Sequence, residues 1–387
     1  MVELLGKSKE ELRVFCAGLG EPAYRGGQIY HALYGERKFD FARMTNLPAV
    51  LRERLAKEAR VTLPEVRQRF VSSDGSVRYL FGLSPGEEKR FDREGTEKES
   101  ADNTEKNGKK LLPSNRPQMP VSVEAVFMPS EGRQTICIST QAGCAVDCHF
   151  CLTAQLGLIR NLTAGEIVAQ VLVALEEQKG QLAPQTNIVL MGQGEPLLNL
   201  EPVMAAMRAL LDPEGVGISP KHVTLSTSGI VPGIERLAQE KVRPKLAISL
   251  NASHDEQRDA LMPINKKYPL KVLMEACKNY PLRPWEHLTF EYVMLGDLND
   301  SPEDARRVAR LLGPLKRVKV NLIPWNPGEL PYRESSPERI EEFRRILNDK
   351  GVPAFVRYSR GRDVMAACGQ LALLDVFTQG GLVSIAP

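Results

Sequence analysis

Three cysteines, Cys144, Cys148 and Cys151, lie within eight residues in the stretch GCAVDCHFCLTAQLG. Cysteine thiolates hold iron–sulfur clusters and structural zinc ions, and both kinds of site usually have four ligands. The spacing C-x3-C-x2-C suits a loop that folds three thiolates around one corner of an iron–sulfur cube. Zinc, completed by His149 or a distant residue, is the alternative, but no second pair of ligands at zinc-motif spacing is found. The stretch predicts an iron–sulfur cluster whose fourth position is not filled by a local cysteine.

Six apolar, β-branched runs accompany this loop, and helical stretches separate them. They are residues 134–140 (QTICIST), 186–192 (TNIVLMG), 221–228 (KHVTLSTS), 244–250 (PKLAISL), 288–295 (LTFEYVML) and 317–325 (RVKVNLIPW). Strand and helix in alternation predict a parallel sheet, either a (β/α) barrel or a doubly wound fold.

Polar or glycine-rich groups follow five of these six runs. The first run leads into the cysteines, the second into GQGEP, the third into STS, the fourth into SLN and the sixth into WNP. In parallel α/β folds, binding sites form at the carboxyl ends of the strands. We therefore expect all five groups to meet at one site.

Several short motifs predict where helices begin and end. Thr163 and Glu166 have the spacing of a capping box, and Ser301-Pro302 and Ser336-Pro337 supply N-cap and first-turn residues. Gly351 stands where a glycine commonly ends a helix.

Composition sets the broad class. The 387 residues are 42% hydrophobic and 26% charged with a net charge of +3, as in ordinary globular proteins. Seven cysteines in such a chain do not form a disulfide framework. No apolar run is long enough to cross a bilayer and no signal peptide is apparent, so we expect a cytoplasmic protein without membrane association.

The cysteine loop resembles the signature of radical S-adenosylmethionine (SAM) enzymes, C-x3-C-x-aromatic-C, with Phe150 as the aromatic residue. The resemblance implies a [4Fe-4S] cluster on Cys144, Cys148 and Cys151, whose open iron is chelated by SAM. It also implies that strand-end residues bind the cofactor. Those expected to do so are Gly194, Glu195, Ser226, Ser249, Leu250, Asn251 and Asn326.

Longer motifs are similar to a narrower family, the dual-specificity 23S rRNA and tRNA adenine-C2 methyltransferases. They include residues 135–167, MGQGEPLLN, VTLSTSGIVPGI, LMPINKKYPL, FEYVMLGDLNDS, VNLIPWNP and AACGQL. The fold class implied is α/β, a partial (β/α)6 TIM-like radical SAM barrel with a small N-terminal helical domain. The expected boundaries are a helical, RNA-binding-like domain at 1–62, a β-rich connector at 63–86, a charged, disordered insert at 87–120, the barrel with its catalytic cysteine segment at 121–374, and a tail at 375–387.

The resemblance also assigns roles to three catalytic residues. Cys368 matches the cysteine that takes a methyl group from one SAM, while a second SAM yields the radical that activates this methyl for addition to adenine C2. Cys137 matches the cysteine that attacks Cys368 and releases the product through a transient disulfide. Glu124 matches the base that takes the C2 proton. The two remaining cysteines, Cys16 and Cys277, lie on apolar helical faces and are expected in the core.

The partners implied are 23S rRNA, tRNA and an electron donor such as flavodoxin or a ferredoxin, with the protein acting as a monomer. Phosphate contacts are expected from the N-terminal helices and from Arg160, Arg357, Arg360 and Arg362. Trp325 is expected to pack beside the cofactor pocket.

The sequence differs from the family pattern in two places, and two other functions are possible alternatives to adenine-C2 methylation. The charged insert is longer than the family pattern, and Asn251 stands where a histidine is frequent. The related resistance methyltransferase, which modifies adenine C8, shares the two catalytic cysteines, but CLTAQLGLIRNLT is more similar to the C2 family. A zinc-stabilised RNA-binding protein without chemistry is the alternative from another class.

Overall fold

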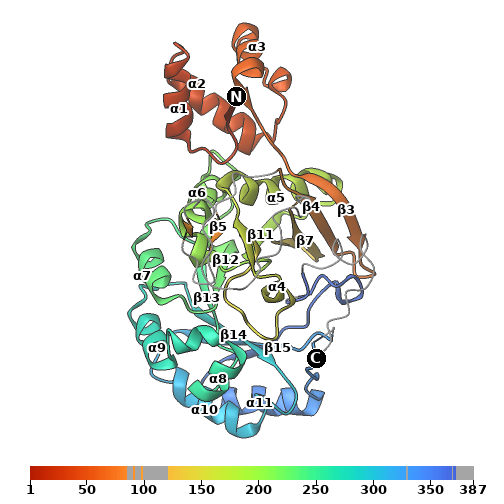
Figure 1. Cartoon of the computed structure of the whole chain (residues 1–387), viewed down its shortest axis with the longest axis vertical. Helices are drawn as coiled ribbons and strands as arrows, with labels where there is room; N and C mark the ends of the chain where they lie inside the picture. The colour runs from red at the N-terminus through yellow and green to blue at the C-terminus, as the bar shows by residue number, and fades with distance from the viewer. Residues whose placement is uncertain (85–89, 92–96, 99–120, 328–329, 368, 372–387) are drawn as a thin grey trace, which may run out of the picture.

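The computed structural model describes residues 1–84, 90–91, 97–98, 121–327, 330–367 and 369–371. A group of N-terminal helices stands at one end of a larger α/β body (Figure 1). In the described residues, no helix is both long and apolar enough to span a bilayer.

The N-terminal helices form as the sequence predicts. They are α1 (Lys9–Gly18), α2 (Tyr24–Tyr30) and α3 (Ala49–Glu58), and short parallel strands β1 (Val2–Glu3) and β2 (Ala59–Arg60) tie their ends together. Ser8 and Glu11 make a capping box at the start of α1, and Cys16 is buried in the core, as expected. Gly6 lies so close to helix α5 (Ala164–Glu177) that an added Cβ would approach the amide nitrogen of Gly165 to 2.4 Å. The helical module is therefore packed tightly against the main body.

One ten-stranded sheet organises the main body, in the order β16-β15-β14-β13-β12-β11-β8-β7-β4-β3. Within this sheet β8, β11, β12, β13, β14, β15 and β16 are parallel neighbours in chain order, and β7, β4 and β3 extend it in antiparallel pairing. The bounds are β3 Glu65–Val71, β4 Val77–Gly82, β7 Ser122–Ser130, β8 Arg133–Cys137, β11 Gln185–Leu190, β12 Val223–Thr227, β13 Lys245–Ser249, β14 Leu288–Met294, β15 Val318–Pro324 and β16 Ala354–Val356.

All six predicted strands are present, and the open sheet with its outer helices confirms the partial barrel. Strand β16 was not predicted, and residues 63–86 contribute β3 and β4 to the main sheet itself. The helices between and after the parallel strands are α5 Ala164–Glu177, α6 Leu200–Leu211, α7 Val231–Gln239, α8 Asp255–Leu261, α9 Leu270–Asn279, α10 Pro302–Leu312 and α11 Pro337–Asp349.

The predicted helix caps are confirmed. Thr163 and Glu166 form a complete capping box on α5, and Ser301 forms one on α10 with Asp304. Ser336 accepts a hydrogen bond from the third residue of α11. Gly351 follows the end of α11 with φ +78°, a conformation that glycine adopts without a steric penalty.

The two faces of the parallel strands differ. On β15 and β12, buried side chains alternate with partly exposed ones, and the buried set joins the large core beneath the helices. Since successive side chains of a strand point to opposite faces, the partly exposed set faces the inside of the barrel. The barrel interior is thus lined, rather than filled, by side chains.

Most of the expected insert, 87–120, and the tail, 375–387, lie outside the described residues. Within the insert the structure describes two short strands, β5 (Arg90–Phe91) and β6 (Glu97–Lys98), paired antiparallel.

Candidate active site

The cysteine loop begins where β8 ends. It contains β9 (Gln141–Gly143), the short helix α4 (Leu152–Gln155) and β10 (Leu158–Asn161), and β10 returns antiparallel to β9. At Gly143, with φ +73°, an added Cβ would lie 1.9 Å from the carbonyl oxygen of Gly157. The backbone amides of Cys144, His149 and Cys151 donate to carbonyl oxygens of Gly157, Leu261 and Cys148 at 3.0 Å each. Backbone contacts therefore hold the loop in its shape.

The three thiols line one pocket, and the surroundings of Cys144 and Cys148 oppose the ionisation of these two. Burial raises the pKa of Cys144 to about 12 and that of Cys148 well above its ordinary value, and the neighbouring Cys151 and Cys144 raise the pKa of Cys148 further. Thiolates at these positions need a compensating positive charge, which bound iron supplies. The donor set therefore fits an iron–sulfur cluster held by Cys144, Cys148 and Cys151.

Zinc fits this donor set less well. Within the residues that the structure describes, no three Cys, His, Asp or Glu side chains gather closely enough to hold one metal ion. A four-iron cluster has no such requirement, since each thiolate binds a different iron.

The pocket next to the thiols is formed by the strand ends, as predicted. The cavity has a volume of about 180 Å³. Its wall includes most of the residues expected to bind SAM, namely Gly194, Glu195, Ser226, Ser249, Asn251 and Asn326. Leu250, the remaining expected residue, is completely buried beside them.

The glycines of the GQGEP turn let the backbone pack closely beside the cysteine loop. A Cβ added at Gly192 would lie 2.7 Å from the hydroxyl of Ser139, and one added at Gly194 would lie 2.5 Å from the Cβ of Gln141. Gly194 also has φ +98°. Any side chain at Gly194 would therefore displace the turn from the pocket wall.

Glu195 is buried and already has hydrogen-bond donors. It accepts from the amide and hydroxyl of Ser228 at 2.7 and 2.8 Å and from the amide of Leu197 at 3.0 Å. Burial raises the pKa of Glu195, and these hydrogen bonds act in the opposite direction. The carboxylate links the segments that follow β11 and β12. These contacts indicate that Glu195 positions the pocket wall.

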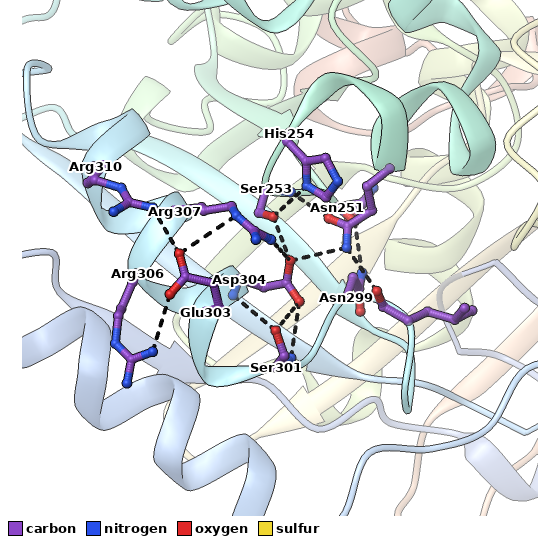
Figure 2. Close-up of polar contacts among 12 residues, drawn as sticks. Asn251, Ser253, His254, Asn299, Ser301, Glu303, Asp304, Arg306, Arg307 and Arg310 are labelled. Carbon is purple, nitrogen blue, oxygen red and sulfur yellow. Dashed lines mark hydrogen bonds and ion pairs between the residues drawn. The ribbon is translucent and has the colours of Figure 1, made fainter.

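Asn251 has a left-handed backbone, with φ +56°, and its amide side chain is engaged. Its oxygen accepts from the amide of Val293 at 2.8 Å, and its nitrogen donates to the sulfur of Met262. Behind it, Asn299 donates to the Asn251 carbonyl at 2.8 Å, and Ser253 and Ser301 donate to Asp304 at the start of α10 (Figure 2). This network fixes the end of β13.

The other polar residues of the pocket wall keep more of their hydrogen-bonding capacity. The hydroxyls of Ser226 and Ser249 are 3.4 Å apart on neighbouring strands, and Asn326 donates to Ser359 at 2.9 Å. Trp325 is buried against Tyr332 and lines the same pocket, as predicted.

Arg258 is a site residue that the sequence reasoning missed. Its side chain is completely buried and donates to the carbonyl oxygens of Leu250, Ser249 and Ser228 at 3.1, 3.1 and 2.6 Å. Burial lowers its pKa to about 10, and its charge lowers the pKa of Cys148. One arginine on α8 thus clamps two strand ends and places positive charge near the thiols.

Of the two expected catalytic cysteines, Cys137 lines a neighbouring cavity that shares Met191 and Leu371 with this pocket. Cys137 is buried on β8 and packs with Val126, Ala366 and Leu371. Cys368 lies outside the described residues, but the chain on both sides of it is placed. The carbonyl oxygens of Gly369 and Leu371 accept from the amide of Leu152 and the hydroxyl of Thr153 at 2.9 and 2.8 Å. These contacts bring the C-terminal segment between the cysteine loop and the strand of Cys137.

Glu124 lies on β7, on the face that carries Val126 and Cys137. It is 1% exposed and pairs with Arg78 of β4, also 1% exposed, at 2.9 Å. Arg78 in turn lies over the ring of Phe70 at 4.1 Å. The sequence reasoning did not identify Arg78, because only the pairing of β4 with β7 brings it to Glu124.

The arginines expected to contact RNA fall into two groups. Arg160 is buried and forms two hydrogen bonds with Glu166, at 2.7 and 2.9 Å, and Arg362 pairs with Glu334 at 3.2 Å. These two guanidinium groups already have acidic partners. Arg357 and Arg360 instead line a second cavity, on the side of the barrel where Cys137 lies.

Comparison with known proteins agrees with this arrangement. Residues 138–312 match the Radical SAM superfamily, and residues 2–61 match the family described as Ribosomal RNA large subunit methyltransferase N-terminal domain. A "Probable dual-specificity RNA methyltransferase RlmN" of Koribacter versatilis is 47% identical over 365 residues, which are 93% of this chain and 99% of that protein. The "Dual-specificity RNA methyltransferase RlmN" of Anaeromyxobacter dehalogenans is 43% identical over 96% of this chain and 91% of its own.

A solved structure gives the same result for the fold. The crystal structure of a radical SAM methyltransferase from Sphaerobacter thermophilus superposes with a TM-score of 0.81 at 39% identity. The match covers 96% of this chain and 99% of that one.

Proposed function

Because the chain belongs to the RlmN family of radical SAM RNA methyltransferases, we propose that it methylates C2 of an adenine in 23S rRNA and in tRNA. One observation supports the proposal most. The residues on either side of Cys368 pack between the cysteine loop and Cys137, which supports the role expected of Cys368. Family membership also makes the alternative of a zinc-stabilised, non-catalytic RNA-binding protein wrong.

The family implies a [4Fe-4S] cluster and SAM. Bound together, these groups supply the 5′-deoxyadenosyl radical. In our proposal Cys144, Cys148 and Cys151 hold the cluster, while Gly194, Ser226, Ser249 and Asn326 are the wall positions left to contact SAM. Glu195 and Asn251 hold that wall in place, and two SAM molecules are used per turnover.

Side chains of the protein carry out the remaining steps. Adenine C2 is electron-poor and cannot attack the SAM methyl, whereas the thiolate of Cys368 can, with S-adenosylhomocysteine as the leaving group. Once the carbon radical has added to C2, the adduct would give one electron back to the redox cofactor, and Glu124 would take the C2 proton. The thiolate of Cys137 then attacks the sulfur of Cys368, which forms a disulfide, and the released carbon takes a proton to become the C2 methyl group. Burial of Cys137 on the wall beside residues 366 and 371 supports this last role.

A base within folded RNA must leave its stack to reach this pocket. The proposal therefore includes RNA docking across the open side of the barrel, with the N-terminal helical domain as a further contact surface. It also includes a flavodoxin or a ferredoxin as the source of electrons and a monomeric enzyme.

The test is an anaerobic product assay. Purified, cluster-reconstituted protein is incubated with SAM, a reductant and unmodified 23S rRNA fragment or tRNA, and the nucleosides are analysed by mass spectrometry. We expect 2-methyladenosine, and we expect none from Cys368→Ala. Cys277→Ala is the matched control, because Cys277 is a buried core cysteine outside the pocket. A product of 8-methyladenosine would refute the assignment to C2, and no methylated adenosine on either RNA would refute the substrate.

A further inference from the structure

A second cavity of the barrel extends from Cys137 to basic side chains that have no role in the proposed chemical steps. It lies on the inner face of the parallel strands and is lined by their partly exposed side chains. Inner positions of closed (β/α)8 barrels are usually packed with bulky branched residues. Here the corresponding inner positions carry polar and cationic side chains such as Asn187, Thr224, Lys245, Thr289 and Lys319.

The lining is strongly positive. Six lysine and arginine side chains border the cavity, while Glu291 is the one acidic side chain among its described lining residues. Glu291 is itself occupied, since it accepts from the amide of Asn321 at 2.9 Å, and Asn321 accepts from Arg357 at 3.1 Å. The charge of Glu291 opposes the lowering of the pKa of Lys319, but one carboxylate cannot balance six cations.

Two lysines are central to this charge. Lys245 on β13 and Lys319 on β15 are both partly buried, and neither forms an ion pair with any residue of the described ranges. Burial lowers the pKa of both lysines; repulsion from Lys319 lowers that of Lys245 further, and Arg357 does the same to Lys319. Like charges held together with little solvent destabilise one another, and a bound anion would relieve the repulsion.

Strand register connects this charge to the catalytic cysteines. Cys137 pairs with Val189, Val189 with Thr224 and Thr224 with Lys245. Four neighbouring strands thus place Cys137 and Lys245 in one row of inner side chains, about 14 Å apart along the sheet. Leu371, three residues after Cys368, lines both this cavity and the cofactor pocket.

We propose that this cavity binds phosphate groups of the RNA next to the target adenine, with Lys245 and Lys319 as its central contacts. The inference rests on the proposed function. When the target adenine lies at the catalytic cysteines, the phosphates on either side of it are the anions that can reach the basic cavity. Ammonium groups are compact phosphate partners that need no fixed bidentate geometry, which suits a flexible single strand.

The experiment compares four forms of the cluster-loaded enzyme with an unmodified tRNA anticodon stem–loop: wild type, Lys245→Met/Lys319→Met, Lys245→Arg/Lys319→Arg, and Lys271→Met. Lys271 is an exposed residue of α9 outside the cavity and serves as the control. Dissociation constants are measured over a salt series, together with KM and kcat. Removal of one lysine–phosphate interaction should flatten the plot of log Kd against log salt by roughly 0.7.

We expect the double methionine variant to lose about 0.7 to 1.4 of this slope and to raise KM on the order of tenfold, with the arginine and Lys271 variants near wild type. An RNA with one neutral methylphosphonate linkage beside the target adenine should bind wild type and the methionine variant with similar affinity. Unchanged slope and KM in a methionine variant that still methylates would overturn the cavity assignment alone. If free inorganic phosphate binds but RNA affinity does not depend on the two lysines, the cavity binds an anion that is not a phosphate of the RNA, and the proposal is refuted. Failure of wild type to methylate both this RNA and the 23S rRNA fragment would instead refute the proposed function.

Discussion

Replacement of Arg78 by methionine tests the buried pair that we place next to the chemistry. Arg78 and Glu124 are each 1% exposed, and their charged atoms are 2.9 Å apart. Burial lowers the pKa of Arg78, and the charge of Glu124 opposes that shift. The guanidinium stays charged, and the carboxylate beside it compensates for the loss of hydration on burial.

The magnitude follows from the burial of both partners. Removal of one member of a buried ion pair costs about 3–5 kcal/mol, because the other charge stays in a medium of low polarity. Replacement of both members by uncharged groups is often close to neutral. We therefore expect Arg78→Met and Glu124→Gln each to destabilise the fold by about 3–5 kcal/mol. The double variant should be destabilised by much less than their sum, with a coupling energy of roughly 3 kcal/mol or more.

The assay is urea unfolding of the four proteins at equal cluster loading, followed by the methylation assay at a temperature where all are folded. Arg78→Lys is the control, since it retains the positive charge with most of the stem. Glu124→Gln and the double variant should both lose 2-methyladenosine formation, because both lack the proposed base, whereas Arg78→Lys should retain it. Single-variant losses below about 1 kcal/mol, or losses that simply add, would refute the account of this pair.

Three further predictions concern the cysteines, the pocket wall and the pH dependence. Cys137→Ala should leave RNA attached to Cys368, seen as a slowly migrating protein–RNA band on a denaturing gel; an equal band in a variant that also lacks Cys368 would contradict this. Gly194→Ala should weaken SAM binding at least tenfold in equilibrium dialysis, because its φ is +98° and the added Cβ collides with β9, whereas Gly180→Ala, with open space around it, should bind as wild type does. Burial raises the pKa of Asp74, but hydrogen bonds lower it more, to about 2 from an ordinary 3.8. A lowered pKa stabilises the fold above pH 4 and loses this effect as the pH falls toward 2, so Asp74→Asn should flatten the fall of the melting temperature in that range. An unchanged fall would contradict that prediction.

Short patterns in the sequence determined the cysteine loop, most strands and several helix ends of this protein. The C-x3-C-x2-C loop, the six strands and the caps at Thr163, Ser301 and Ser336 all depend on residues close together in the chain, so the sequence specifies them directly. The meeting of the strand-end groups was also predictable, since parallel strands present their carboxyl ends at one edge of a sheet. Likewise, the two remaining cysteines could be placed in the core from the apolar faces that carry them.

Contacts between distant strands were decided only by the tertiary structure. Arg78 meets Glu124 through the pairing of β4 with β7, across an interval that includes the charged insert. Arg258 reaches the ends of β12 and β13 from a helix that follows them, and Lys245 shares a row with Cys137 only because four strands have one particular register. A shift of one residue in any of these pairings would turn the side chains to the other face of the sheet. The sequence thus specifies which chemical groups are available, while strand register decides which of them face one another, because register depends on the packing of the whole sheet.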